Sequence, residues 1–368
     1  FKAMPVGGGS TLTLSWEVRL RQDAFSNAAL ARDHDPRQTL LRGALGADFR
    51  VDRHVRLYGE VATGQVRGRR DVAAPNFQND ASLQQLLVDL RGQAGTTMLG
   101  AMVGRQEFAD GPRQLLSVSD GPNVHRTWNG VRLYAHGRRL RMGAFDLRVT
   151  RPARGAFDEA IERGERLRGV NASLIVSRDG GGAHLYLDPF WIHSARADFR
   201  AGRSTGADER DSYGARLWGR RGRVAFDWTA VAQHGHFMQR DVEAWGVFAV
   251  QRMALSESGW KPRLDLRVDA ASGGGTHALG ALREFNPLYA SSAYLGEGQL
   301  LGLANLFMLA PGLTLTPAPA TSVTLEYGVA RRLARGDAVR AGGMRAYPRT
   351  QDVNGSAIGS LLRIAAAR

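Results

Sequence analysis

The chain has 368 residues, of which 43% are hydrophobic, and it contains no cysteine. The lack of cysteine excludes disulfides, thiolate catalysis and cysteine-based zinc sites. No segment approaches the roughly 18 uninterrupted apolar residues of a membrane-spanning helix, which excludes a helical membrane protein. The 45 glycines and many short apolar runs instead favour numerous strands joined by turns.

The formal net charge is +14, and arginine supplies almost all of it because Lys2 and Lys261 are the only lysines. Two explanations stand side by side. A GC-rich genome favours arginine codons, and the planar guanidinium group offers paired donors to carboxylates or phosphates that an ammonium group lacks.

The first predicted strand covers residues 10–21, where apolar side chains such as Trp16 alternate with charged ones such as Glu17. The segments 41–50 and 55–61 repeat this alternation, so the three segments predict consecutive antiparallel strands.

The same alternation continues to the end of the chain. The further predicted strands are 83–93, 96–106, 128–137, 139–150, 167–178, 183–193, 211–221, 223–234, 241–253, 262–271, 298–316, 321–332 and 355–367. The total is on the order of 16 strands, each long enough to cross a bilayer when tilted. These strands predict one domain, residues 1–368, with an all-β fold.

Short turns, such as 138–139, 180–182 and 221–222, alternate with long polar connections. The predicted long loops are 65–81, 107–127, 151–166, 194–210 and 272–297. Short turns at one end and long, extracellular loops at the other are typical of a transmembrane up-and-down β-barrel of the outer membrane. Residues 156–166 have two readings, a solvated charged loop or a short helix within such a loop.

Residues 262–270 show the alternation most strictly. Leu264, Leu266 and Val268 share one face, and Arg263, Asp265, Arg267 and Asp269 share the other. Four ionised residues in succession on one face indicate a strand between lipid and charged water.

The phase of each strand predicts a set of arginines opposite the apolar face, interspersed with carboxylates. The inward candidates are Arg19, Arg21, Arg42, Arg56, Arg91, Arg132, Arg148, Arg216, Arg263 and Arg267, with Asp265 among the acidic residues. One interpretation is a wall held together by ion pairs. The other is an electropositive passage that concentrates anions.

Catalytic and metal-binding patterns are weak. His234 and His236 share one side of a strand, but no further ligand completes a metal set. The serine in 355–359 is misplaced for a nucleophile elbow, and the glycines at 273–275 precede no phosphate-binding lysine. We therefore expect neither an enzyme nor a cofactor.

Two blocks are more specific than the alternation. The segments 104–107 (GRQE) and 126–133 (RTWNGVRL) resemble a motif pair of the alginate export family of outer-membrane proteins. The later segments 260–264 (WKPRL), 271–273 (ASG), 285–289 (FNPLY), 294–296 (YLG) and 305–306 (NL) are similar to that family's C-terminal signature in order and spacing.

The resemblance implies a monomeric barrel of about 18 strands in the bacterial outer membrane. Its electropositive, arginine-lined constriction would pass an anionic polyuronate without energy input. Carried over by motif, Arg105, Arg132, Arg263 and Asp265 are the expected pore-lining residues. Trp128 and Asn129 replace the family's usual Phe-Asp, which removes a carboxylate there. We further expect that the chain lacks its last strand and that the native protein continues.

The function expected from these features is passive export of an anionic, alginate-like polysaccharide, with outer-membrane lipid and periplasmic secretion proteins as partners. A general porin that takes up small anions fits the same fold. An outer-membrane enzyme is disfavoured because nothing pairs a serine with a histidine. A nucleic-acid binder is disfavoured because the arginines alternate along many strands and form no single patch.

Overall fold

The computed structural model describes residues 2–69, 72–178, 184–277 and 280–368. These residues form one sheet of 17 strands, and every strand pairing with a defined register in it is antiparallel, as between β2 and β3 and between β10 and β11. Contacts group the chain into two compact units, Phe1–Val170 with Leu288–Tyr294, and Asn171–Pro287 with Leu295–Arg368.

The first unit holds the first eight strands and the beginning of the ninth. They are β1 (Met4–Gly7), β2 (Ser10–Ala24), β3 (Arg37–Arg50), β4 (Val55–Arg67), β5 (Asn79–Ala94), β6 (Thr97–Glu107), β7 (Thr127–His136), β8 (Leu140–Arg151) and β9 (Ala160–Arg178). A single 3-10 turn, η1 (Ala28–Leu30), lies between β2 and β3.

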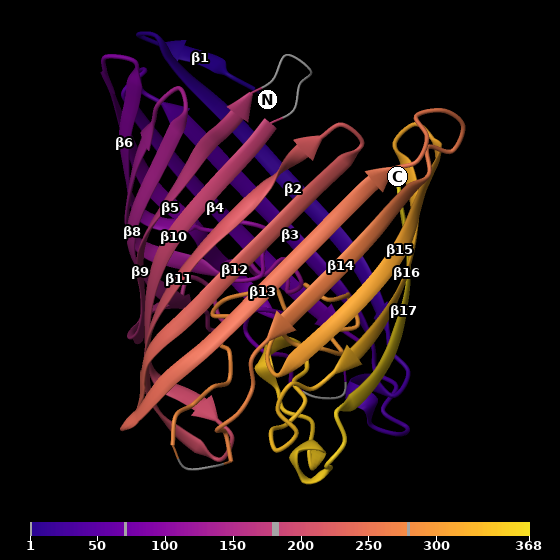
Figure 1. The fold of residues 1–368 in the computed structure, drawn as a ribbon. Helices are drawn as coiled ribbons and strands as arrows, with labels where there is room; N and C mark the ends of the chain where they lie inside the picture. The colour runs from indigo at the N-terminus through magenta and orange to yellow at the C-terminus, as the bar shows by residue number, and fades with distance from the viewer. Residues whose placement is uncertain (1, 70–71, 179–183, 278–279) are drawn as a thin grey trace. The chain divides into compact units, whose positions relative to one another are not determined.

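The second unit holds the end of β9 and the remaining strands. They are β10 (His184–Ala201), β11 (Ser204–Arg221), β12 (Val224–Phe237), β13 (Arg240–Ala254), β14 (Arg263–Ala271), β15 (Leu306–Ala318), β16 (Thr321–Arg331) and β17 (Ala357–Ala367). Two 3-10 turns, η2 (Gly342–Met344) and η3 (Thr350–Asp352), lie between β16 and β17. Strands β10 to β14 run side by side in Figure 1.

Side chains alternate between two faces of the sheet because successive residues of a strand point to opposite sides. On β3, Leu41 and Leu45 are 43% and 64% exposed, whereas Leu40 and Arg42 are 0% and 6% exposed. We call the side of Leu45 the outward face and the side of Arg42 the loop-covered face. In the second unit, Leu264 and Leu266 of β14 are exposed, and Asp269 is buried.

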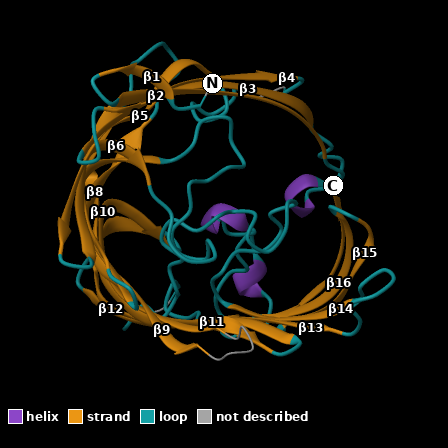
Figure 2. Cartoon of the chain, turned by 90° about the horizontal axis from the view of Figure 1, so that it is seen from above, coloured by secondary structure: helices purple, strands orange, loops and turns teal. Residues whose placement is uncertain are grey.

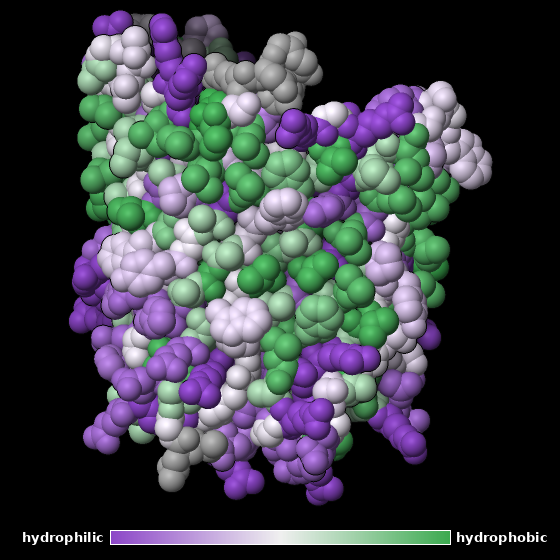
Figure 3. All heavy atoms as spheres, in the orientation of Figure 1, coloured by the Kyte–Doolittle hydropathy of each residue, from purple (hydrophilic) through white to green (hydrophobic). Residues whose placement is uncertain are grey.

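The outward face of the second unit is apolar along much of the strand length. Figure 3 shows hydrophobic side chains gathered over β11 to β14 and hydrophilic ones beyond them, toward the end where the long loops lie. This pattern is typical of strands that cross a lipid bilayer. No helix among the described residues is long and apolar enough to cross a membrane.

The other face is covered by loops. Figure 2 shows these loops on the concave side of the strands. In the second unit, Leu282 of the β14–β15 loop joins a buried cluster with Phe199, Phe237 and Val242 of β10, β12 and β13. In the first unit, Tyr289 packs edge-on against Trp128 of β7, with 4.6 Å between ring centroids.

Two predicted connections are wrong. Residues 194–210 form no long loop, because β10 and β11 continue through them and turn at Gly202 and Arg203. Gly202 has φ +60°, and a Cβ there would lie 2.1 Å from the carbonyl oxygen of Thr276, so the turn requires glycine. The polar residues that suggested a loop, such as Asp208 and Arg210, are buried beneath another loop.

The expected loop at 151–166 is also shorter, because β9 begins at Ala160, and the segment contains no helix. Leu167 is fully buried, and the Tyr289 hydroxyl donates to Glu165 (2.9 Å). These contacts on the loop-covered face stabilise the charged segment as part of β9. Connections remain at 108–126 and 272–305, near two of the expected loops. The predicted turn at 180–182 lies outside the described residues.

We predict that Gly100→Ala destabilises the fold by about 1–3 kcal/mol, because overpacking forces side chains to move. Tyr134 lies across Gly100 on the neighbouring strand, and an added Cβ would lie 2.1 Å from its ring. The midpoint of thermal unfolding in detergent measures the effect. Gly92→Ala is the control, since its Cβ would meet no atom within 4 Å; equal midpoints for both variants would contradict the prediction.

Candidate functional site

A cluster of charged residues fastens the β6–β7 loop to β2 and β3 in the first unit. Asp120 of this loop accepts hydrogen bonds at Oδ1 from Arg19 and Arg42, both at 2.9 Å. Arg42 also donates to Glu17 through Nε (2.9 Å) and Nη2, and Arg19 donates to the carbonyl of Pro122 (2.7 Å). Asp120 of the loop and Glu17 of β2 together neutralise two arginines that would otherwise repel each other.

His125 extends this cluster to β6. Its Nδ1 lies 2.5 Å from Glu107 and its Nε2 lies 2.9 Å from Asp120. Burial lowers the pKa of His125, as does the positive charge of Arg42, whose Nη1 lies 2.5 Å from Nε2. The hydrogen bonds to the two carboxylates and the charge of Glu107 outweigh both and raise the pKa above 6.5. With a carboxylate at each nitrogen, the imidazolium form makes both contacts.

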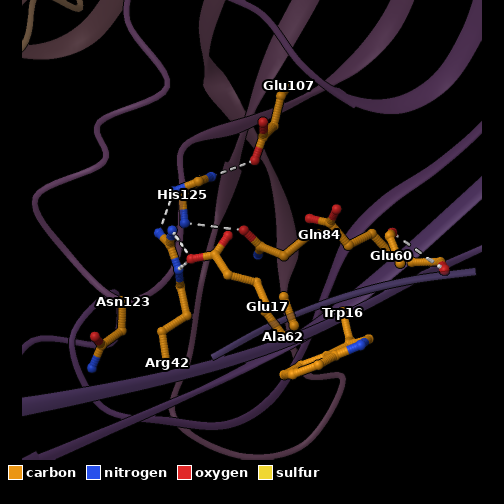
Figure 4. A pocket seen from close by; sticks show the side chains of 12 residues that line it. Trp16, Glu17, Arg42, Glu60, Ala62, Gln84, Glu107, Asn123 and His125 are labelled. Carbon is orange, nitrogen blue, oxygen red and sulfur yellow. Dashed lines mark hydrogen bonds and ion pairs between the residues drawn. The ribbon is translucent and has the colours of Figure 1, made fainter. Parts of the chain in front are cut away.

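Four side chains of the cluster, Glu17, Arg42, Glu107 and His125, help to line a cavity of about 280 Å³. Figure 4 shows Arg42 and His125 pointing toward Glu17 and Glu107 across it, while the Trp16 ring points away. Every charged residue of the lining has a polar partner, Glu60 included, which accepts from Tyr58 at 2.7 Å. The arrangement is suited to holding the loop in place.

A second cluster of the first unit joins β4, β5 and β7. Asp89, fully buried, accepts from Arg91 (2.9 Å to Nε) and from the Tyr134 hydroxyl (2.7 Å). Arg56 donates to Asp48 (2.9 Å) and lies 3.9 Å from Asp89. Arginines and carboxylates therefore alternate across neighbouring strands on the loop-covered face.

The second unit repeats this arrangement on β10 to β12. Arg216 forms two parallel hydrogen bonds with Asp227, both at 2.7 Å, and its Nη1 lies 3.5 Å from Asp188. Its guanidinium also covers the Trp218 ring at 4.8 Å. Two carboxylates around one arginine fix its orientation and reduce the local positive potential.

A more accessible group lies on β13 to β15. Arg263 donates to Asp265 (3.0 Å), and Arg252 lies 3.6 Å from the same carboxylate. The Thr314 hydroxyl also donates to Asp265 (2.6 Å). The Arg252 and Arg263 side chains are 51% and 41% exposed, so a dissolved anion can reach both guanidinium groups.

Arg267 is more enclosed than Arg263, the other predicted arginine of β14. It lies 3.9 Å from both Asp269 and Glu326, and its side chain is 15% exposed. Glu326 also accepts from Arg363 of β17 at 3.0 Å. The charged residues of β14 therefore form ion pairs with neighbouring strands, in addition to facing water.

A fully buried ionic network holds the loops of the second unit. Arg210 of β11 donates to Asp208 (2.8 Å) and to the carbonyl of Glu284 (2.9 Å). The Glu284 carboxylate accepts from Arg340 of the β16–β17 loop at 2.7 and 3.0 Å. The sequence interpretation missed these residues because Arg210 fell in a predicted loop; the i, i+2 spacing of Asp208 and Arg210 is the signal of a shared strand face.

Most predicted site residues lie on the loop-covered face. They are Arg19, Arg21, Arg42, Arg56, Arg132, Arg216, Arg263, Asp265 and Arg267. Arg21 pairs with Asp23 at 2.6 Å. Arg132 covers the Phe108 ring of the β6–β7 loop at 4.4 Å, so this loop shields it.

The inward placement of Arg105 and Arg148 is wrong. Arg105 of β6 lies opposite Leu86 of β5, which is 59% exposed. On its other side Arg105 lies opposite Asn129 of β7, and Asn129 in turn lies opposite Arg148 of β8. Residues directly opposite each other share a face, so both arginines lie on the outward face.

The phase of β8 was misread because its apolar residues lie on the other side. Phe145 packs against Phe108, with 4.8 Å between ring centroids, and Leu147 is fully buried. The β6–β7 loop supplies an apolar surface there. The apolar residues Phe145 and Leu147 therefore face the loop, and the polar residues next to them face outward, the reverse of the pattern in most other strands. Arg105 is held outside by Asn129 (3.1 Å) and Glu159 (3.3 Å).

Metal binding finds no support in the part of the chain that the structure describes. No group of three or more His, Asp or Glu residues is arranged to hold a metal ion among those residues.

Solved structures share this fold. The BenF-like porin of Pseudomonas fluorescens Pf-5 is 10% identical, with 90% of this chain and 85% of that chain covered and a TM-score of 0.59. OccK2 (OpdF) of Pseudomonas aeruginosa is 13% identical, with 89% and 82% covered and a TM-score of 0.55. OpdK of Pseudomonas aeruginosa with vanillate is 11% identical, with 88% and 82% covered and a TM-score of 0.57.

The fold is that of the outer-membrane β-barrel porins, which are channels of the bacterial outer membrane and not enzymes. Within that class the chain belongs to the alginate export family, whose sequence model matches residues 10–366. No curated protein matches the sequence.

We predict that the loop attachment through His125 weakens as the pH rises. A raised pKa in the folded state means that this stabilisation is complete below 6.5 and is lost as the pH passes the folded-state value. Between about pH 6 and 9, the wild-type protein should lose on the order of 1 kcal/mol of unfolding free energy relative to His125→Gln. The loss is measured as a fall of the wild-type thermal unfolding midpoint relative to that of the variant. Parallel pH curves for the two proteins would show that His125 does not hold the loop.

Proposed function

We propose that the chain is a passive outer-membrane channel for an anionic polysaccharide of the alginate type, a polyuronate. The observation that carries the proposal is the accessible arginine pair Arg252 and Arg263, which share the carboxylate of Asp265. Arg263 already donates a hydrogen bond to a carboxylate, and Arg252 lies 3.6 Å from the same carboxylate, as two arginines that receive a uronate would.

Transport would proceed by exchange of partners. A polymer carboxylate displaces Asp265 from one arginine, and Asp265 rebinds when the polymer moves on, so each site stays weak. Weak, repeated sites suit conduction, because a site that holds the polymer tightly stalls it. The pairs at Arg216 and Arg267 would extend the same series along the loop-covered face.

One similar structure supports the substrate class. It is OccK2 of Pseudomonas aeruginosa in complex with glucuronate, a single uronate. That protein shares the fold with this chain at 13% identity. The complex therefore supports only the point that a porin of this fold can bind a uronate.

A second candidate function is uptake of small anions by a porin of modest selectivity. The fastened β6–β7 loop favours it, because Asp120 and Pro122 close over Arg19 and Arg42 on the first unit's loop-covered face. A covered arginine meets a small solute more readily than a hydrated polymer. On either proposal the partners are the transported anion and outer-membrane lipid, and we propose a monomer; export would add periplasmic secretion proteins.

The two proposals predict different behaviour in a planar bilayer. On the export proposal, polymannuronate added to one side blocks the ionic current, and a neutral glucan of the same length does not. We expect Arg263→Gln to weaken the polymannuronate block about tenfold, since it removes a charged hydrogen bond to the polymer.

Arg168→Gln is the matched control, because Arg168 lies 3.7 Å from Asp146 on the outward face. It removes the same charge and should leave the block unchanged. Equal block by polymannuronate and glucan would overturn the polyuronate proposal and leave the small-anion porin.

A further inference from the structure

The arginines of the loop-covered face differ in exposure along the strands. On β3, the Arg42 side chain, nearer the long-loop end, is 7% exposed, and the Arg50 side chain at the short-turn end is 58% exposed. On β11, the corresponding values are 0% for Arg210 and 61% for Arg220. In each unit the long loops therefore cover arginines toward one end of a strand and leave those at the other end accessible.

Two accessible arginines lie at the short-turn end of the first unit. Arg50 is the last residue of β3, and its nearest carboxylate, that of Asp48, is 3.8 Å away. Arg141 is the second residue of β8, and the registers of β5 to β8 place it on the same face as Asp89. Arg141 is exposed, and it forms no ion pair among the residues that the structure describes. Both guanidinium groups are therefore open to a dissolved anion.

Three accessible arginines lie at the short-turn end of the second unit. Arg220 of β11 and Arg252 of β13 share the loop-covered face, because both lie opposite the same residue of β12. Arg252 and Arg263 share the carboxylate of Asp265, and Arg220 lies 3.7 Å from Glu257, which is itself 71% exposed. We call five residues the short-turn arginines: Arg50, Arg141, Arg220, Arg252 and Arg263.

The short connections beside these arginines are also basic. They carry the exposed residues Arg53, Arg139 and Arg223, and the carboxylates within the described short connections are those of Asp52 and Glu257. An excess of exposed positive charge raises the local concentration of an anion and speeds its association. The short-turn end of the strands is therefore suited to attract a polyanion from solution.

We propose that the short-turn arginines capture the anionic polymer at the periplasmic end of the strands, so that the polymer enters the channel from that side. The inference rests on the proposed function and adds the end at which the polymer binds first. Short turns of outer-membrane barrels face the periplasm. The five side chains lie on the loop-covered face, which favours a dissolved polymer over a lipid. Capture sets how often a polymer enters, and the exchange pair Arg252 and Arg263 sets how long it stays.

Block of single channels by polymannuronate, added to one side at a time, tests the capture. The chain has no cysteine, so a biotin attached to Gly336→Cys in the β16–β17 loop marks the long-loop side for streptavidin. A Cβ at Gly336 would meet no atom within 4 Å. We expect association from the short-turn side to be about tenfold faster than from the long-loop side. Raising KCl from about 0.1 to about 1 M should abolish this difference, because salt screens the arginines.

Arg50→Gln/Arg141→Gln/Arg220→Gln should slow association from the short-turn side about tenfold and leave the duration of each block unchanged, because Arg252 and Arg263 remain.

Arg32→Gln/Arg113→Gln/Arg335→Gln is the matched control. It removes the same charge from exposed positions of the long loops and should leave association from the short-turn side at the wild-type rate. Equal association rates from the two sides, or a wild-type rate in the short-turn variant, would overturn the capture while the proposed function stands. Block by polymannuronate no stronger than block by the neutral glucan would overturn the proposed function, and the capture with it.

Discussion

The pairing of arginine with carboxylate across neighbouring strands is the interaction on which the rest of this structure depends. Most strands present an apolar face outward, so most of their polar residues lie on the other face, much of which is covered by loops. A guanidinium group in such a place costs several kcal/mol when it lacks a partner. Asp48, Asp89, Asp227 and Asp265 supply those partners from adjacent positions.

The same requirement explains how the loops are fastened. Asp120 reaches from the β6–β7 loop to Arg19 and Arg42, and Glu284 binds Arg340 while its carbonyl accepts from Arg210. Charges that the strands leave incompletely paired are completed by the loops. The loop positions are thus set by the electrostatics of the strands, and the remaining accessible arginines are those that no loop reaches, such as Arg252 and Arg263.

The sequence predicts the strands and most of the faces, because alternation is a local property. For β14 it predicts every side correctly, and it places Arg263, Asp265 and Arg267 on the loop-covered face. For β8 the prediction of faces fails, because Phe145 and Leu147 face the β6–β7 loop. Phe108 of that loop packs against Phe145 but precedes it by 37 positions in the chain. Likewise, Asp208 and Arg210 look like loop residues until the buried partners from 284 and 340 are known. Alternation cannot distinguish a strand covered by lipid from one covered by an apolar loop.

Ion selectivity tests the central claim most directly, because the claim is that arginines on the loop-covered face remain able to exchange their carboxylates for dissolved anions. The reversal potential of single channels under a KCl gradient should show a preference for chloride, and Arg252→Gln/Arg263→Gln should move it toward zero. A cation preference, or a reversal potential that this double variant leaves unchanged, would contradict the account.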